Sequence, residues 1–284
     1  MSRSSESPPL AGICVAVFES RMAGPSADLI TKHGGVPLSA PALREIPLGD
    51  SPEVTAFAEQ LTVGGLDVVI FETGVGVRYL TQAIEARMPR EAWLDALARV
   101  KVVARGPKPV AALRELKVRV DLHVPEPNTW HETLALLDTQ LPVAGLRVAV
   151  QEYGKPNIEL VEGLEKRGAT VTRVPVYRWA LPEDLGPLRA AIVEIAQGRV
   201  AIALFTSAQQ VEHLLRVAAD EAREAELRNA LNTCTVVGSI GPTTSETLRA
   251  HGLPVDIEPE HPKLGHLVAA VAAGWRATGK VTLK

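Results

Sequence analysis

Short apolar runs recur along the chain, and each is followed by a polar turn and a stretch with helical spacing. The first run, 12–17, is rich in β-branched residues; after a Gly24-Pro25 break, a helix is predicted over 26–33 that stops at Gly34-Gly35. Further strands are predicted at 68–71, 101–104, 147–150, 170–175, 200–205 and 235–237. Runs that are apolar nearly throughout are typical of parallel sheets covered by helices on both faces. The pattern therefore predicts an α/β fold.

The chain also repeats itself with an offset of about 134 residues. The matching segments are 11–19 with 144–152, 69–71 with 203–205, 105–107 with 240–242, and 116–125 with 252–259. Four matches in nearly one register predict an internal duplication. We therefore expect two similar parallel-sheet (flavodoxin-like) domains with a cleft between them.

Composition and charge narrow the class of protein. The chain has 284 residues, of which 46% are hydrophobic and 22% are charged, as in globular proteins of one or two domains. With 30 Lys and Arg against 33 Asp and Glu, the net charge of −3 gives no basic footprint for nucleic acid or an anionic membrane. No run approaches the length of a membrane span. We expect neither nucleic acid nor membrane as a partner.

The cysteines and the N-terminal segment indicate a cytoplasmic protein. Cys14 and Cys234 both lie in apolar runs, where inert core thiols in a reducing compartment are expected. Residues 1–9 are polar, contain two prolines and lack the apolar region of a secretory signal. This segment is predicted to be a disordered leader.

Candidate binding residues lie in five turns where predicted strands end and helices begin. Ligands of parallel sheets bind beyond the carboxyl ends of the strands, where helix N-termini offer free N–H groups and a positive dipole end. The residues are Thr73, Gly74, Val75 and Gly76; Arg105, Gly106 and Lys108; Tyr153, Gly154 and Lys155; Thr206 and Ser207; and Ser239, Ile240, Gly241, Thr243 and Thr244. Any α/β protein needs glycines and caps at single turns. Five such turns on two related sheets predict a shared site for an anion such as a carboxylate or phosphate.

Familiar catalytic motifs are absent from the sequence. Gly74-Val75-Gly76 lacks the third glycine of a dinucleotide fingerprint, and no phosphate-binding P-loop occurs. Ser239 is no nucleophile elbow, because Val237 occupies a position that needs glycine. The closest histidines, His261 and His266, lack the spacing of two metal ligands on one helix face. We therefore expect no cofactor and no metal.

Three segments, taken in order, resemble the uroporphyrinogen-III synthase family over roughly residues 11–275. They are 174–178 (Val-Pro-Val-Tyr-Arg), 205–208 (Phe-Thr-Ser-Ala) and 237–244 (Val-Gly-Ser-Ile-Gly-Pro-Thr-Thr). The segments 73–77, 104–108 and 153–156 look like the bacterial branch, although Gly74 and Lys108 depart from residues common there. The resemblance implies a cofactor-independent enzyme, by default a monomer, whose partner is a linear tetrapyrrole.

The resemblance also implies a reaction, the closure of hydroxymethylbilane to uroporphyrinogen III. Loss of the ring A hydroxyl as water leaves an azafulvene cation, and attack by the substituted carbon of ring D gives a spiro intermediate that recloses with that ring inverted. Tyr177 matches the family's tyrosine position and is expected to orient or protonate the departing hydroxyl. A packing role at a hinge is the alternative. The turn residues given above are expected to bind the substrate carboxylates.

A further implication of the resemblance is a chain that crosses between domains and returns. Residues 8–42 and 179–284 would form one domain, residues 51–172 the other, and residues 43–50 and 173–178 two linker strands that act as a hinge. The competing hypothesis is a non-enzymatic two-domain binder or sensor of a small polycarboxylate. Periplasmic binders of that kind need an export signal, which is not visible here.

Overall fold

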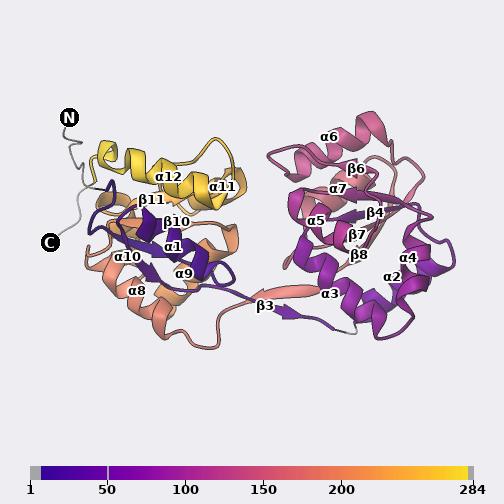
Figure 1. Cartoon of the computed structure of the whole chain (residues 1–284), viewed down its shortest axis with the longest axis horizontal. Helices are drawn as coiled ribbons and strands as arrows, with labels where there is room; N and C mark the ends of the chain where they lie inside the picture. Colours follow the sequence, from indigo (N-terminus) through magenta and orange to yellow (C-terminus); the bar gives the residue numbers. More distant parts are fainter. Residues whose placement is uncertain (1–7, 50, 281–284) are drawn as a thin grey trace, which may run out of the picture. The chain divides into compact units, whose positions relative to one another are not determined.

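The computed structural model describes residues 8–49 and 51–280 (Figure 1). Residues 1–7 of the expected leader, Asp50 at the end of the expected first linker, and residues 281–284 lie outside the described residues. The described residues up to Arg44 and from Ala180 onward form one compact unit, unit 1, and Glu45–Trp179 form unit 2.

The sheet of unit 1 is fully parallel. Its strands, in order across the sheet, are β11 (Val236–Ser239), β10 (Ile202–Phe205), β1 (Cys14–Val17) and β2 (Val36–Ser39). A parallel bridge from Gly238 to Ile257 extends the β11 edge. The helices are α1 (Ala23–Lys32), α8 (Gly186–Ala196), α9 (Ala208–Asp220), α10 (Glu224–Thr233), α11 (Pro242–Ala250) and α12 (Leu264–Gly274), followed by the 3₁₀ helix η1 (Trp275–Thr278).

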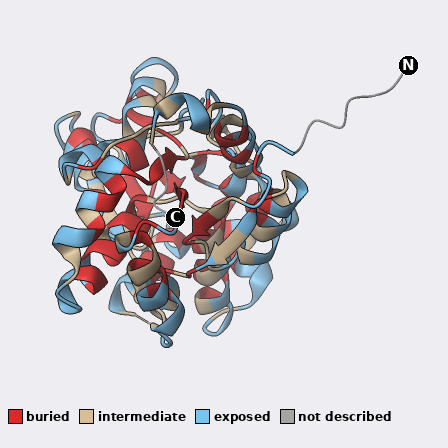
Figure 2. Ribbon diagram, turned by 90° about the vertical axis from the view of Figure 1, so that its left-hand side faces the viewer, coloured by how far each residue is buried: buried red, intermediate tan, exposed pale blue. Residues whose placement is uncertain are grey.

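The two faces of this sheet are covered by different helices. Because side chains alternate along a strand, Ala203 and Val237 face α8, α9, α10 and α11, while Ile202 and Val236 face α1 and α12. Strands β10 and β11 are buried throughout and β1 nearly so, whereas the edge strand β2 is only partly buried. Figure 2 shows the buried residues in red and the exposed outer parts of the helices in pale blue. The nearly continuous apolar runs of the sequence are thus explained by burial on both sides.

The sheet of unit 2 is also parallel. Its strands, in order, are β6 (Leu122–His123), β5 (Lys101–Ala104), β4 (Val68–Phe71), β7 (Arg147–Gln151) and β8 (Thr170–Val174). Val69 and Phe71 face one helical layer, whereas Val68 and Ile70 face the other. The first layer contains α2 (Pro52–Thr62), α3 (Gly74–Glu85), α4 (Arg90–Leu97) and α5 (Pro107–Glu115), and the second contains α6 (Trp130–Gln140) and α7 (Ile158–Glu165).

The strands matched by the sequence repeat hold the same places in the two sheets. β1, β2, β10 and β11 of unit 1 correspond to β7, β8, β4 and β5 of unit 2, and the Ile257 bridge corresponds to β6. The α/β class with two parallel sheets is therefore confirmed.

A separate two-stranded sheet, β3 (Arg44–Pro47) with β9 (Tyr177–Ala180), lies where the chain passes between the units. The structure differs here from the expected linker 173–178. Arg173 and Val174 belong to β8 and pair with Val150 and Gln151, because Val174 is fully buried in the core of unit 2.

The first predicted helix also begins earlier than expected. Gly24 and Pro25 do not interrupt the chain; they lie in the first turn of α1, which starts at Ala23. Proline is tolerated there because the N–H groups of the first turn have no intrahelical acceptor.

Candidate active site

Each sheet has one point at which the connections leave in opposite directions, and ligands of α/β proteins bind beyond the strand ends at this point. In unit 1 the point lies between β1 and β10, and in unit 2 between β7 and β4. The turns that follow these strands carry Glu19 and Thr206 in unit 1, and Glu152 and Glu72 in unit 2. Each unit thus places polar side chains, carboxylates among them, at its own switch point.

A buried carboxyl group occupies the switch point of unit 2. Glu72 is 2% exposed, and its Oε1 accepts hydrogen bonds from Asn157 Nδ2 at 2.6 Å and from Arg105 Nη1 at 3.2 Å. Burial raises the pKa of Glu72 to about 7, and the charge of Glu152 adds to this, although Arg105 and Asn157 oppose it. Carboxyl groups with such pKa values are concentrated at functional sites.

A cluster of aromatic rings begins beside Arg105, the cation that contacts Glu72. Tyr153 lies under the Arg105 guanidinium, with the Arg105 carbon Cζ 4.6 Å from the ring centroid. Ring centroids of Tyr153 and Trp179 are 5.5 Å apart, those of Tyr177 and Trp179 6.4 Å, and those of Tyr79 and Tyr177 5.8 Å. The chain has three tyrosines, so all of them lie in this one cluster.

Tyr177 is connected to the start of α3. Its hydroxyl lies 3.3 Å from Thr73 Oγ1, and Thr73 caps the helix by accepting a hydrogen bond from the Gly76 N–H at 3.0 Å. The Thr73 N–H in turn donates to Gln151 Oε1 at the end of β7, at 3.4 Å. Tyr177 is only 4% exposed and packs in the core of unit 2, a position that suits both the acid and the packing hypothesis.

Glycines of these turns have packing reasons of their own. A Cβ on Gly74, the first residue of α3, would lie 2.6 Å from the Lys108 carbonyl oxygen at the start of α5. Gly154 has φ +52°, and a Cβ there would lie 2.3 Å from the Trp179 indole. Close approach of backbone and ring therefore requires glycine at both positions, whether or not a ligand binds.

In unit 1 the carboxyl group at the switch point, Glu19, contacts hydroxyl and amide groups, whereas Glu72 of unit 2 contacts an arginine. Thr206 Oγ1 donates a hydrogen bond to Glu19 Oε1, which also accepts from Gln210 Nε2 at 3.4 Å. Ser207 caps α9 by accepting from the Gln209 N–H at 3.3 Å.

The end of β11 carries a second polar group of unit 1. Ser239 is fully buried; its hydroxyl donates to the Gly241 carbonyl at 3.3 Å and accepts from Ser245 Oγ at 2.8 Å. Both predicted threonines lie in the first turn of α11, with Thr243 exposed and Thr244 buried. The Thr244 side chain is thus turned into its own unit.

The structure brings some predicted residues together and leaves others apart. Thr73, Arg105, Tyr153 and Tyr177 belong to one cluster in unit 2. The remaining predicted residues of unit 2 flank it: Val75 and Gly76 lie in the first turn of α3, Gly106 is the N-cap of α5, and Lys108 and Lys155 are exposed. In unit 1, Ile240 and Gly241 connect β11 to α11.

The sequence pattern did not single out several polar residues of the switch points as site residues. They are Glu19 and Gln210 in unit 1, and Glu72, Gln151, Glu152 and Asn157 in unit 2. For two of these residues the sequence itself offers a signal. Glu72 and Glu152 follow directly after buried strands, at the strand ends where ligands of parallel sheets bind.

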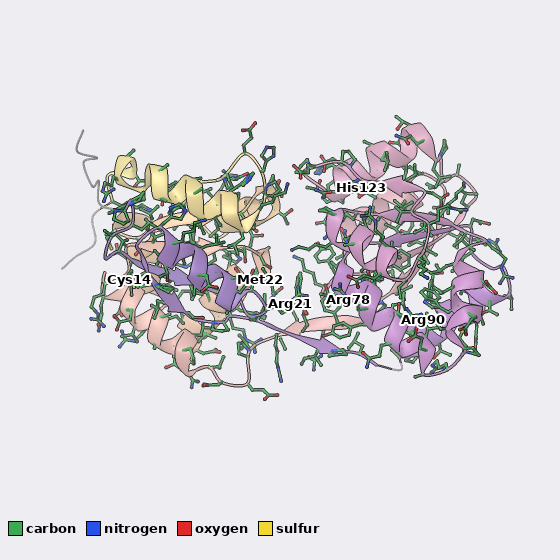
Figure 3. The ribbon with its side chains drawn as sticks, in the orientation of Figure 1. Cys14, Arg21, Met22, Arg78, Arg90 and His123 are labelled. Carbon is green, nitrogen blue, oxygen red and sulfur yellow. The ribbon has the colours of Figure 1, made fainter. Side chains whose placement is uncertain are left out.

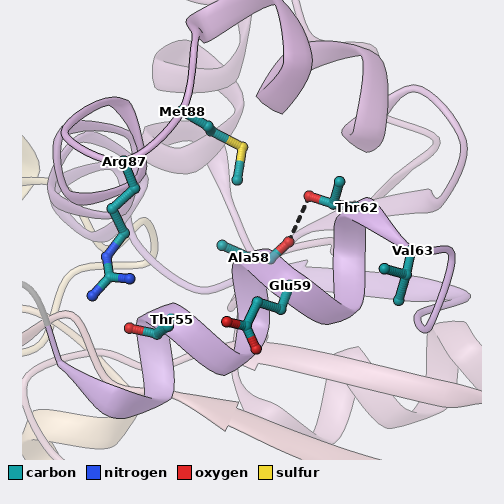
Figure 4. A pocket seen from close by; sticks show the side chains of 7 residues that line it. All are labelled: Thr55, Ala58, Glu59, Thr62, Val63, Arg87 and Met88. Atoms are coloured by element: carbon teal, nitrogen blue, oxygen red, sulfur yellow. Dashed lines mark hydrogen bonds between the residues drawn. The ribbon is translucent and has the colours of Figure 1, made fainter.

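Other surfaces carry less chemistry. A pocket lined by Thr55, Ala58, Glu59, Thr62, Val63, Arg87 and Met88 contains none of the predicted residues (Figure 4). Arg78, labelled in Figure 3, pairs with Glu115 across α3 and α5.

Within residues 8–49 and 51–280, no group of three or more His, Cys, Asp or Glu is arranged to hold a metal ion. Of the helices that the structure describes, none has the length and apolarity needed to cross a bilayer.

Comparison with known proteins identifies relatives along nearly the whole chain. The family described as uroporphyrinogen-III synthase HemD matches residues 25–269. A Methanothermobacter thermautotrophicus protein provisionally assigned as a uroporphyrinogen-III synthase is 32% identical over 87% of this chain and 92% of its own.

Solved structures give the same result. A mutant uroporphyrinogen III synthase of the extremely thermophilic bacterium Thermus thermophilus aligns with a TM-score of 0.69 and 29% identity over 94% of this chain and 98% of its own. The wild-type Thermus enzyme in a second crystal form aligns with a TM-score of 0.54 and 30% identity, covering 94% and 99% of the two chains.

Proposed function

The chain belongs to the uroporphyrinogen-III synthase family, and from this premise we propose that it closes hydroxymethylbilane into uroporphyrinogen III. It is an enzyme of porphyrin biosynthesis, a cyclising lyase. The family match over residues 25–269, which extends into both units, carries this conclusion. A non-enzymatic binder is not favoured, because similarity to synthases extends along nearly the whole chain.

The chemistry places modest demands on the protein. The pyrrole nitrogens of the bilane drive out the hydroxyl group, which leaves as water, so the enzyme needs a weak proton donor and a bound conformation that disfavours direct closure. We assign the donor role to Tyr177. Support comes from its hydroxyl, which lies 3.3 Å from Thr73 Oγ1 at the N-terminus of α3, where the helix dipole favours negative charge.

The substrate carboxylates need partners that do not make the protein strongly basic. N-terminal turns of α3, α5, α9 and α11 present backbone N–H groups at the predicted turns of both units. Exposed Lys108 and Lys155 and partly exposed Arg105 supply full positive charges in unit 2. A chain with a net charge of −3 can bind a polycarboxylate in this way.

The working state we propose is a monomer in the cytoplasm without metal or cofactor. Loss of water and ring rearrangement involve no net change of oxidation state, and the free thiols Cys14 and Cys234 suit a reducing compartment. Dialysis against a chelator should leave the activity intact. A loss that is restored by one specific metal would overturn the cofactor-free proposal, and light scattering of the active fraction would test the monomer.

A direct assay tests the function. Purified protein is incubated with freshly prepared hydroxymethylbilane, the products are oxidised, and the type I and type III isomers are separated. Type III should dominate with the protein and type I without it. Type I alone in both samples would overturn the proposed activity.

A further inference from the structure

Glu72 is the most deeply buried titratable side chain at the switch point of unit 2, and the mechanism above gives it no role. Its two side-chain donors, Asn157 Nδ2 and Arg105 Nη1, contact the same oxygen, Oε1, and the backbone N–H of Tyr153 also donates to the carboxyl group. The other oxygen, Oε2, has no hydrogen-bond partner and is inaccessible to solvent. If Glu72 were ionised, a charged oxygen would be buried without a hydrogen-bond partner, and this would cost free energy of folding. A carboxylic acid protonated on Oε2 removes the charge and leaves only the smaller cost of an unpaired buried hydroxyl.

Arg105 is held by this arrangement without being neutralised. Its guanidinium lies over the Tyr153 ring, is hydrogen-bonded to Glu72 Oε1, and keeps 21% of the side chain exposed. A neutral acid at position 72 positions the guanidinium but leaves its positive charge available to an incoming anion. An ionised Glu72 would compensate that charge internally.

We propose that Glu72 is a positioning residue that acts as a neutral carboxylic acid, holding Arg105 against Tyr153 so that the guanidinium receives one carboxylate of the substrate. This inference rests on the proposed function, since the substrate is a polycarboxylate. It distinguishes Glu72 from the ordinary ion pairs of unit 2. Asp67 and Arg147, for example, form an exposed pair at the amino ends of β4 and β7.

Other groups that face Glu72 come from each neighbouring turn. Glu152 follows β7 and is itself paired with Arg173, whose Nε lies 2.6 Å from its Oε1. Tyr153 is next along the chain, and its backbone N–H donates to the Glu72 carboxyl group. Burial, then Glu72 and Glu159 of α7, raise the pKa of the Tyr153 hydroxyl, and Arg105 opposes this. Arg105 is thus the cation in direct contact with Glu72.

The test compares three substitutions at positions 72 and 105 by steady-state kinetics. Glu72→Gln keeps an acceptor at Oε1 and no charge, so its KM should stay within about twofold of wild type at pH 6.5. Glu72→Met removes the acceptor and should raise KM at least about fivefold with little change in kcat, because a carboxylate remote from the reacting ring is bound equally in ground and transition states. Arg105→Met should raise KM equally, and the double variant no further.

The pH profile separates positioning from a merely structural role. Wild-type KM should rise between about pH 6.5 and 8.5 as Glu72 ionises and compensates Arg105, whereas KM of Glu72→Gln should stay flat. Asp67→Asn is the matched control and should follow wild type. An unchanged KM in Glu72→Met, or the same pH dependence in Glu72→Gln and wild type, would overturn the proposal.

A measurement without substrate checks the protonation state. An infrared carbonyl band of a buried carboxylic acid should be present in the wild-type protein near pH 6 and absent from Glu72→Gln. Its absence from the wild type would overturn the neutral-acid role. If the wild-type protein forms no type III isomer while the infrared band is present, the proposed function is wrong. The conclusion that Glu72 is protonated would still hold.

Discussion

Unit 1 and unit 2 have the same strand order but different chemistry at their switch points. In unit 1, Glu19 is surrounded by the neutral donors Thr206 and Gln210. In unit 2, the buried Glu72 contacts a cation, Arg105, whose guanidinium lies over the Tyr153 ring. The sheet order depends on apolar strands that the two halves share, so the residues just after the strands were free to diverge. Duplication thus gives two similar sheet edges with different polar groups, neutral donors around Glu19 in unit 1 and the buried Glu72 beside Arg105 in unit 2.

The largest expected effect is the dependence of the stability of unit 2 on pH. The folded pKa of Glu72, about 7, lies above its ordinary value of 4.5. Between these values the unfolded chain gives up the proton that the folded chain keeps, so stability falls as pH rises and is constant above about pH 7. Across this pH range the free energy of unfolding should fall by on the order of 3 kcal/mol.

Denaturant unfolding of wild type and Glu72→Gln from pH 4.5 to 8 measures this effect. The variant should lack the decline, because it cannot ionise. Parallel pH curves for the two proteins would show that burial of Glu72 costs unit 2 no stability.

A smaller effect is expected at the start of α3. The repeat aligns Gly74 of unit 2 with Ala208 of unit 1, where α9 accepts a side chain. Gly74→Ala should destabilise unit 2 by about 1–3 kcal/mol, because its Cβ would meet the Lys108 backbone. Thermal unfolding measures the change. Gly265→Ala in α12 is the control, with open space around the new Cβ and an expected gain of up to about 1 kcal/mol.

Tyr177→Phe tests the catalytic role of the aromatic cluster. Removal of the hydroxyl should lower kcat at least about tenfold with little change in Tm, if it donates a proton to the departing oxygen. Tyr79→Phe, in the same cluster, is the control and should retain kcat. A wild-type rate would make Tyr177 a hinge residue, and a large loss of stability would show that its hydroxyl holds the linker together.

The smallest effect is expected in unit 1. Thr243→Ala together with Thr244→Ala should raise KM about threefold without unfolding the protein, chiefly through loss of the exposed Thr243 hydroxyl in the first turn of α11. Thr247→Ala, one turn further along, is the control; its hydroxyl donates to the Thr243 carbonyl. Unchanged kinetics in the double variant would remove these threonines from the site, leaving unit 2 as the main source of side-chain contacts.

Local patterns in the sequence determined much of the fold. Apolar runs predicted the strands β4 and β5 to the residue, and the repeat predicted which strands correspond between the units. The small hydroxyl residues Thr73 and Ser207 are the helix caps that their turns indicated. These features depend on alternation, helical spacing and capping, which act over a few residues.

The tertiary structure alone decided which polar groups meet. Glu72 and Arg105 are 33 residues apart, Glu72 and Asn157 are 85 apart, and Thr73 and Tyr177 are 104 apart. The order of strands across the sheet brings these turns together, and no local pattern specifies that order. Burial of Glu72, and with it the shift of its pKa, depends on the helices and rings packed around the end of β4. The sequence by itself thus determined where the turns lie, whereas long-range packing determined their chemistry.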